Sequence, residues 1–396
     1  MNICIIKGGN LPVPAVKGGA VEVLLDLLVR LNEKYAKAQF YVISTWDEEA
    51  EVKSKSFKHT EYCYIKKNNK FQDILFIIAR VINKVSRIIS NVEICNYSPY
   101  YAAALSISKR IHPDYIVFEG GFYGAPFSKF LRYYKSEQLF FHLHGNWFPT
   151  KTVSKTIGNI ISVSRFINNE YLKYNINQKL RSNIVYNCID EDAFKKTISD
   201  TERQEIRNKY NFNDDDFIVL FCGRICADKG ASELIEAVSN CNKKIKLLIV
   251  GSHNFGAQES SPYIKQIKKI CEDYNDKIKF TGFVLNSQVY KYYQSVDCMC
   301  IPSMWDEPGA LVNIEAQWSG LPIVATDSGG EIEYLSNENT IFVERDGFVV
   351  KKLTEAFEFL YKNPEVRSDM AKKSKERAAQ FSMESYYKNY LTCFGI

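Results

Sequence analysis

The sequence predicts an α/β protein of two successive domains, each a parallel β-sheet with helices on both faces. The chain has 396 residues, enough for two domains at ~150 residues each. Short, continuously apolar runs alternate with longer helical patterns, as expected for strands that are buried on both faces of a parallel sheet. This alternation stops in a polar segment, residues 195–216, and then begins again.

In the first half, helical segments such as Ala20–Glu33 and Pro99–Ile111 separate the apolar runs. A strand, a helix and a second parallel strand in succession imply right-handed crossovers and a doubly wound, Rossmann-like sheet. The predicted strands are Asn2–Lys7, Gln39–Ser44, Tyr115–Glu119, Gln138–Leu143, Asn159–Ser162 and Asn183–Tyr186.

The second half repeats the pattern, so we place a domain boundary near residue 195, with domains 1–195 and 196–380. Its apolar runs are residues 217–223, 244–251, 277–283, 296–302, 322–328 and 340–344.

Composition excludes several classes of protein. A formal net charge of +5 is small for this length and argues against a dedicated nucleic-acid binder. The eleven cysteines are scattered, several of them in apolar runs, as for free thiols in a reducing compartment, and their spacing does not suggest a zinc site. The N-terminus lacks the pattern of a signal peptide, and no apolar run reaches the ~20 residues that cross a bilayer. We therefore expect a cytoplasmic protein.

The segment Lys70–Ser90 is predicted to be an amphipathic helix. Its apolar residues, among them Phe71, Ile78 and Val85, recur at helical spacing, and basic residues lie on the other side. Such a helix could lie on the inner face of an anionic cell membrane, or its apolar stripe could pack in the core. The sequence leaves both interpretations open.

Two motifs follow predicted strands. Gly18 and Gly19 lie between the first strand and the first helix, where the backbone can approach a ligand and the helix offers free N–H groups. Gly223 and Arg224 end the first strand of the second domain, and Lys229 lies at the next helix start. Ligands of open α/β sheets bind at the carboxyl ends of the strands, and these two cations suit a diphosphate.

A third motif begins at Glu307, with Glu315 eight residues later and a glycine-containing turn between them. The backbone N–H groups of Gly309, Ala310 and Leu311 could face a phosphate or a sugar. The two carboxylates could accept hydrogen bonds from sugar and ribose hydroxyls, and would share one helix face if both lie on that helix.

Taken together, these motifs resemble the retaining glycosyltransferases of family 4, whose GT-B fold has two Rossmann-like domains facing each other across a cleft. The resemblance implies that Arg224 and Lys229 bind the donor diphosphate, Glu307 the donor sugar and Glu315 the ribose. Gly19 would lie against the diphosphate. The first domain would be the acceptor side, the second would bind the nucleotide sugar, and a C-terminal helix at about 381–396 would pack back on the first domain.

By the same resemblance, His144 would lie beside the donor sugar, whereas His142 is expected on the opposite face of its strand. The sequence departs from the family where Gly309-Ala310 replaces the usual Phe-Gly and where Cys188, not Gly, follows Asn187. These departures leave the charged residues in place and bear on the identity of the donor.

The predicted activity is a hexosyl transfer with retention, from a nucleoside-diphosphate sugar (UDP-sugar favoured) to a glycan or lipid-linked glycan, in cell-surface polysaccharide synthesis. Two Asp-x-Asp matches, at residues 190–192 and 214–216, are interpreted as turns, so we expect no metal and no cofactor. Alternatives are a non-catalytic partner of a transferase and a nucleotide-sugar epimerase. A nicotinamide dehydrogenase is disfavoured because the glycine fingerprint is absent from both domains.

Overall fold

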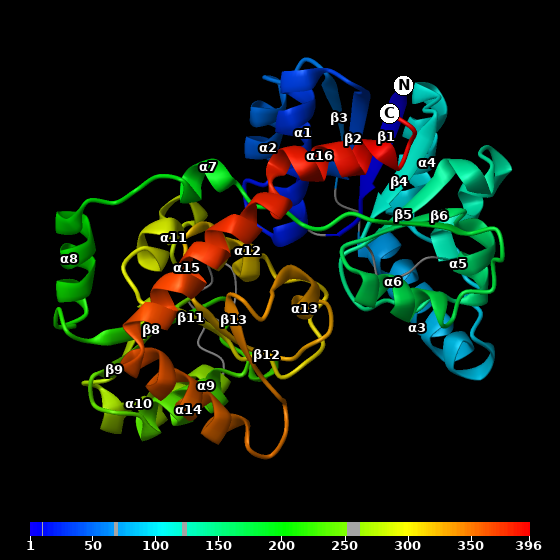
Figure 1. Cartoon of the computed structure of the whole chain (residues 1–396). Coiled ribbons are helices and arrows are strands. Elements are labelled where there is room, and N and C mark those ends of the chain that lie inside the picture. The colour runs from blue at the N-terminus through cyan, green and yellow to red at the C-terminus, as the bar shows by residue number, and fades with distance from the viewer. Residues whose placement is uncertain (10, 67–69, 121–124, 252–261) are drawn as a thin grey trace. The chain divides into compact units, whose positions relative to one another are not determined.

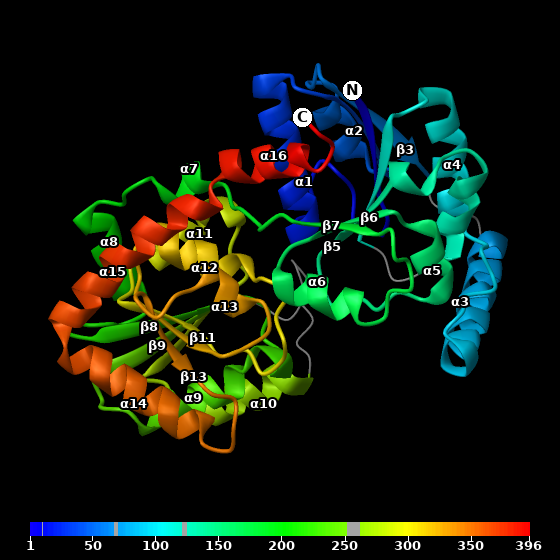
Figure 2. The ribbon, with the colours of Figure 1, turned by 45° about the vertical axis from the view of Figure 1, so that its right-hand side comes forward.

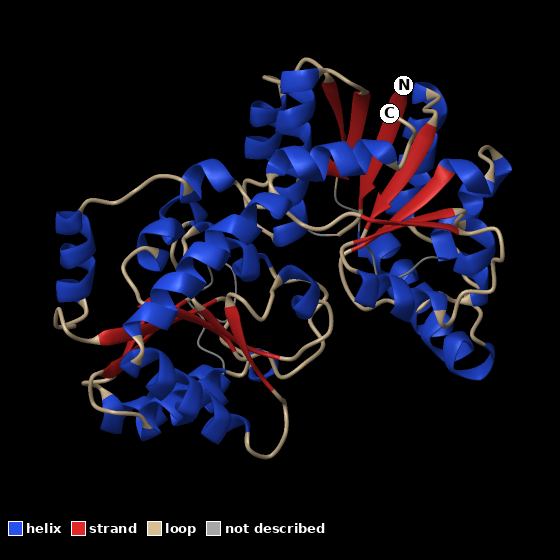
Figure 3. Ribbon diagram, in the orientation of Figure 1, coloured by secondary structure: helices blue, strands red, loops and turns tan. Residues whose placement is uncertain are grey.

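The computed structural model describes residues 1–9, 11–66, 70–120, 125–251 and 262–396. The chain divides into two compact units (Figure 1). The first unit comprises Met1–Asn187 together with Met383–Ile396, and the second comprises Cys188–Ser382. Each unit is a parallel sheet with helices on its faces (Figure 3).

The sheet of the first unit has seven strands in the order β3-β2-β1-β4-β5-β6-β7, and every adjacent pair is parallel. The order reverses between β1 and β4, which makes the carboxyl ends of these strands the edge where doubly wound sheets bind ligands. The strands are β1 (Asn2–Lys7), β2 (Gln39–Thr45), β3 (Thr60–Ile65), β4 (Tyr115–Glu119), β5 (Leu139–Leu143), β6 (Asn159–Ser162) and β7 (Arg181–Ile184).

The last helix of the chain belongs to the first unit and packs on its first helix (Figures 1 and 2). Tyr387 donates a hydrogen bond to Asn32 Oδ1 (2.8 Å), and its ring stacks on Tyr35. The α-helices of this unit are α1 (Ala20–Tyr35), α2 (Glu48–Ser54), α3 (Lys70–Ser90), α4 (Pro99–Ile111), α5 (Lys151–Thr156), α6 (Arg165–Leu172) and α16 (Met383–Thr392), and its 3-10 helices are η1 (Ala125–Arg132) and η2 (Ser136–Gln138).

The second unit repeats this architecture with six parallel strands in the order β10-β9-β8-β11-β12-β13. The strands are β8 (Phe217–Cys222), β9 (Ile245–Val250), β10 (Ile278–Gly282), β11 (Cys298–Ile301), β12 (Ile323–Thr326) and β13 (Thr340–Val343). The α-helices are α7 (Glu191–Phe194), α8 (Asp200–Lys209), α9 (Ala231–Asn240), α10 (Pro262–Cys271), α11 (Asn286–Tyr293), α12 (Leu311–Trp318), α13 (Glu331–Tyr334), α14 (Val349–Lys362) and α15 (Pro364–Ala378), with 3-10 helices η3 (Ala227–Lys229), η4 (Glu272–Tyr274) and η5 (Ala379–Phe381).

The predicted α/β class with two doubly wound sheets is confirmed, and two elements were missed. Strand β3 is an edge strand whose residues are mostly half-exposed, so it lacks a continuous apolar run. Helix α8 lies within the polar segment and begins at a capping box of Ser199 and Glu202. The first unit ends at Asn187, before the boundary that we expected at residue 195, because Phe194 of α7 packs on Tyr293 of the second unit.

Helix α3 exposes its apolar stripe, so the interpretation that this stripe packs in the core is wrong. Its buried side carries Ala79, Asn83 and Ser86 instead. Asn83 exchanges two hydrogen bonds with the backbone of Cys95 (2.7 and 2.8 Å). Residues at least 40% exposed are Phe71, Ile74, Ile77, Ile78, Val81, Ile82, Val85, Ile88 and Ile89. Within the described parts of the chain, no helix has the length and apolar character needed to cross a membrane.

Candidate functional site

A polar cluster lies at the carboxyl ends of the strands in the second unit, and its centre is Glu307. This carboxylate is buried, pairs with Lys229 and accepts hydrogen bonds from Ser303 Oγ (2.8 Å) and Trp305 Nε1 (2.6 Å), all through Oε1. The Lys229 ammonium also lies 5.7 Å from the Trp305 ring centre. The structure therefore brings together Lys229 and Glu307, to which the resemblance assigned the diphosphate and the sugar.

Backbone packing brings Glu307 and Lys229 into contact. Gly230 has φ 67° and starts helix α9, and a Cβ atom there would overlap the carbonyl oxygen of Pro302. The Met304 amide donates to the carbonyl of Asp228 (2.8 Å). The loop that follows β11 is thereby joined to the loop that follows β8, which places Glu307 beside Lys229.

Helix α12 begins at Leu311, four residues after Glu307, so Glu307 lies in the loop before the helix and only Glu315 is helical. Ala310 occupies the N-cap and has no side chain that could accept from the first helical N–H groups. Gly309 has φ 148°, and the ring of Tyr334 fills the place of a Cβ atom. The first turn of α12 is thus open to an anion or a hydroxyl.

Glu315 lies near the end of β8 and accepts a hydrogen bond from Tyr293 Oη (2.7 Å). Burial raises the pKa of Glu315, and the Tyr293 hydrogen bond opposes that shift. The thiol of Cys222 lies close to Glu315. Burial, and then the charge of Glu315, raise the pKa of this thiol. Gly223 has φ 146°, and the exposed Arg224 follows it. Among the described residues, Arg224 forms no ion pair with the Lys229–Glu307 group.

Glu331 joins this cluster and was not among the predicted site residues. It is fully buried at the start of α13 and accepts a hydrogen bond from Ser328 Oγ (2.6 Å). Burial, and then the negative charge of Glu307, raise the pKa of Glu331 to about 8. Glu331 is therefore mostly protonated at neutral pH. The signal in the sequence is its position directly after Gly329 and Gly330, where the Gly330 amide donates to the Glu307 carbonyl.

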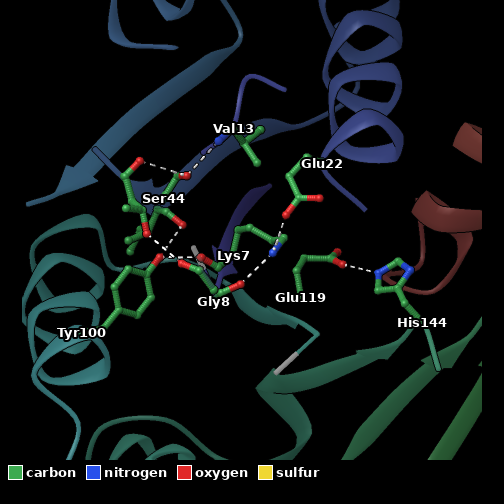
Figure 4. Close-up of polar contacts among 11 residues, drawn as sticks. Lys7, Gly8, Val13, Glu22, Ser44, Tyr100, Glu119 and His144 are labelled. Atoms are coloured by element: carbon green, nitrogen blue, oxygen red, sulfur yellow. Dashed lines mark hydrogen bonds and ion pairs between the residues drawn. The ribbon is translucent and has the colours of Figure 1, made fainter. Parts of the chain in front are cut away.

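The first unit has its own polar group at the carboxyl ends of β1 and β4, shown in Figure 4. Lys7 is buried, donates to the carbonyl of Gly8 (2.6 Å) and pairs with Glu22 of α1 (2.9 Å). Gly19 has φ 102° and no space for a Cβ atom, because the Glu22 carboxylate lies there. Gly18 has φ 75° and faces open space. The prediction for the two glycines did not include Lys7 or Glu22, whose pairing depends on the fold.

His142 and His144 both reach Glu119, so the expectation that they lie on opposite faces of the strand is wrong. His142 Nδ1 lies 3.1 Å from Glu119 Oε1, and His144 Nε2 lies 2.7 Å from Glu119 Oε2. Residues two apart on a strand point to the same face, so His142 and His144 should have been predicted on one face. Glu119 ends the neighbouring strand β4 and is fully buried.

Electrostatics define the protonation of this group. Burial and then the charge of His142 lower the pKa of His144 to about 4, against the opposing effect of Glu119. Burial alone would raise the pKa of Glu119, but the charges and hydrogen bonds of the two histidines lower it overall. A neutral His144 that donates from Nε2 to an ionised Glu119 presents Nδ1 as an acceptor for a hydroxyl.

The same three side chains have ligand atoms within 4.8 Å of one another, a spacing that could also hold a metal ion. Each imidazole can donate an N–H to Glu119, so the carboxylate is satisfied by hydrogen bonds alone. Glu119, His142 and His144 therefore fit a hydrogen-bonded triad.

A cavity of about 970 Å³ lies in the first unit, at the same edge of the sheet. Its lining includes Lys7, Tyr100, His142, His144 and Trp147. Thus His144, Gly18 and Gly19 belong to the first unit, and the other predicted site residues belong to the second.

The comparisons with known proteins agree with this fold. A crystal structure of Anabaena Alr3699/HepE in complex with UDP-glucose superposes with a TM-score of 0.75 at 18% identity, covering 100% of both chains. WaaG, a glycosyltransferase involved in lipopolysaccharide biosynthesis, gives a TM-score of 0.65 at 14% identity, covering 100% of this chain and 99% of that one. The predicted GT-B type of fold, with two Rossmann-like units, is confirmed.

Sequence comparisons find similarity to glycosyltransferases. Residues 202–377, most of the second unit, match the family model of the group 1 glycosyl transferases. Spore coat protein SA of Bacillus subtilis is 24% identical over 100% of this chain and 99% of its own length. The lipopolysaccharide 1,2-N-acetylglucosaminetransferase of Salmonella typhimurium is 26% identical over 38% of this chain and 40% of its own length. The part of the chain that matches the group 1 glycosyl transferases is thus residues 202–377 of its second unit.

Proposed function

We propose that this chain transfers a hexose from a nucleoside-diphosphate sugar, with UDP-sugar favoured, to a hydroxyl of a glycan or lipid-linked glycan. The observation that supports this proposal most directly is the cluster in the second unit. In this cluster, Lys229 pairs with Glu307 near the N-terminus of α12, which has no side-chain cap. An ammonium and the N–H groups of a helix's first turn suit a diphosphate, and a buried carboxylate suits sugar hydroxyls. A neighbour in the same fold was solved with UDP-glucose.

The chemical demand falls on the leaving diphosphate, whose negative charge grows as the glycosidic bond breaks. Lys229, the exposed Arg224 and the first N–H groups of α12 would stabilise that charge, because preorganised cations and dipoles act where charge develops. Glu307 would hold the sugar through its hydroxyls, and Glu315 would hold the ribose. We propose retention by a front-face transfer, in which a departing phosphate oxygen takes the proton of the acceptor hydroxyl.

Aspartates of both Asp-x-Asp segments take part in local backbone structure, which supports a reaction without a metal ion. Asp190 is the N-cap of α7 and Asp192 lies in the first turn of this helix, so the prediction of a turn at residues 190–192 is wrong. Asp216 accepts a hydrogen bond from the Asn213 amide (2.7 Å) and stabilises a turn. The charge on the diphosphate is then assigned to protein cations.

Thermal unfolding with UDP, GDP, ADP, CMP and NAD, without added metal, tests the donor site. A ligand that binds only the folded state stabilises it by about 2.7 kcal/mol at 100 times its Kd. We expect a shift with UDP that is lost in Arg224→Ala and kept in Lys243→Ala, because Lys243 is exposed and lies before β9, at the opposite end of the strand. A shift with NAD alone, or equal shifts in both variants, would contradict the assignment.

We also propose that α3 lies on an anionic membrane. Its stripe exposes nine large apolar residues on one helix, as surfaces that mark an interaction do, and the exposed Arg80 and Lys84 border it. Flotation on vesicles with and without phosphatidylglycerol tests this contact. Binding to the anionic vesicles should fall about tenfold or more in the double variant Ile78→Asp, Val85→Asp, because charged groups enter the apolar region of a membrane only at high cost. Val52→Asp, an exposed site on α2, is the control; equal loss in the control would refute the contact.

A further inference from the structure

Helix α3 forms part of the wall of the first-unit cavity while its apolar stripe faces outward. Asp73, Phe76 and Arg80 line the cavity. In Figure 2, α3 lies at the edge of the first unit. The helix therefore has one side on the cavity and another side exposed to the surroundings.

The two sides of α3 share a border along the helix. Each cavity-lining residue is followed directly by an exposed apolar residue, in the pairs Asp73–Ile74, Phe76–Ile77 and Arg80–Val81. Successive residues of an α-helix are about 100° apart, so the apolar stripe begins where the cavity wall ends. The rotation of the helix is fixed by the bonds of its buried side, where Asn83 binds Cys95 and Ser86 donates to the Val92 carbonyl (2.7 Å).

The charge at this wall is basic on balance. Lys66 and Arg80 line the cavity and are exposed, with Asp73 as the acidic lining residue. Lys7 also lines the cavity, but Glu22 already pairs with it. Arg80 lies 6.0 Å from the Phe76 ring centre, so a cation and an aromatic surface occur together on α3. Tyr100 and Trp147 also line the cavity and give it aromatic rings, while the Tyr100 hydroxyl already donates to the carbonyl of Lys7 (2.6 Å).

We infer that the cavity receives the head of a lipid-linked acceptor that carries a phosphate, with its hydrocarbon chain along the exposed stripe of α3. Arg80 and Lys66 bind the phosphate, and the sugar part lies against the aromatic wall. This inference rests on the proposed glycosyl transfer and narrows its acceptor from glycans in general to amphiphiles with an anionic linkage.

The test uses the full chain and three probes: decyl phosphate below its micelle concentration, inorganic phosphate, and decyl maltoside as a neutral amphiphile. Titration calorimetry measures the binding of each probe, and UDP is titrated in parallel. We expect decyl phosphate to bind at least about tenfold more tightly than either other probe. Arg80→Gln should weaken decyl phosphate about tenfold, because a charge-assisted contact is lost, and should leave UDP binding unchanged.

Arg110→Gln is the matched control, since Arg110 is exposed on α4 of the same unit and does not line the cavity. Equal weakening in both variants would overturn the inference, as would inorganic phosphate or decyl maltoside binding as tightly as decyl phosphate. The UDP titration separates the two proposals. If the wild type does not bind UDP, the proposed function is refuted. If the wild type binds UDP but does not bind decyl phosphate selectively, only this inference is refuted.

Discussion

Glu331→Gln should stabilise the second unit increasingly as the pH rises. In the folded protein, burial and the charge of Glu307 raise the pKa of Glu331 from its ordinary value of 4.5 to about 8. Between these two values the folded state holds a proton that the unfolded state releases. Stability is therefore lost as the pH rises from about 4.5 to about 8, and the loss is constant above that range.

The size of this effect follows from the two pKa values. The cost of keeping the carboxyl protonated is about 1 kcal/mol at pH 5 and about 3 kcal/mol at pH 7, at 1.36 kcal/mol per pKa unit. Glutamine has nearly the same shape and does not titrate. The stability of Glu331→Gln relative to the wild type should thus grow by about 2 kcal/mol between pH 5 and pH 7.

Urea unfolding in a Trp46→Phe, Trp147→Phe background measures this difference, because the two remaining tryptophans, Trp305 and Trp318, lie in the second unit. Glu338→Gln is the control, since Glu338 is exposed and water solvates its carboxyl in both states. A stability difference for Glu331→Gln that stays flat from pH 5 to pH 7 would refute the reasoning.

Three further perturbations test the packing of the two sites by urea unfolding, with the tryptophan background above for the second unit and with Trp46 and Trp147 retained as reporters for the first unit. Gly309→Ala should destabilise the second unit by about 1–3 kcal/mol because its Cβ meets a tyrosine ring, whereas Gly347→Ala, where space is open, should have almost no effect. Tyr293→Phe removes a 2.7 Å hydrogen bond to a buried carboxylate and should cost about 1–3 kcal/mol; no change in midpoint would contradict that bond. Glu22→Gln leaves Lys7 buried without its ion-pair partner and should lower the stability of the first unit by about 3–5 kcal/mol. Adding Lys7→Met should recover part of this stability. A double variant that is less stable than Glu22→Gln would count against the ion pair.

Much of the fold could be predicted because buried parallel strands are continuous apolar runs. Strand β1 and helices α3 and α4 have the bounds that their patterns predict. The signal failed where burial is partial, as in the edge strand β3. Periodicity also identified the stripe of α3 without determining its direction, because polar bonds of Asn83 to a later segment turn the stripe outward.

The candidate site was predictable in its motifs and not in its pairings. The motifs located Lys229, Glu307 and Glu315, and the structure places the first two in contact. Glu331 was missed because its pKa depends on Glu307, which is distant in the sequence. The pair of Lys7 and Glu22 was missed because a lysine that ends an apolar strand gives no sign of its partner. The roles of these residues in transfer stay predictions.

The most direct test of the central claim is release of UDP from a panel of UDP-sugars, with UDP-glucose first and with water as the acceptor of the sugar, in the presence of a chelator. We predict turnover by the wild type, and a loss of roughly 10²–10³-fold in Lys229→Met, which removes a preorganised cation, and in Glu307→Gln. Lys243→Ala should keep wild-type turnover. Equal turnover by the wild type and both site variants, or no release from any UDP-sugar by a chain that binds UDP, would contradict the account.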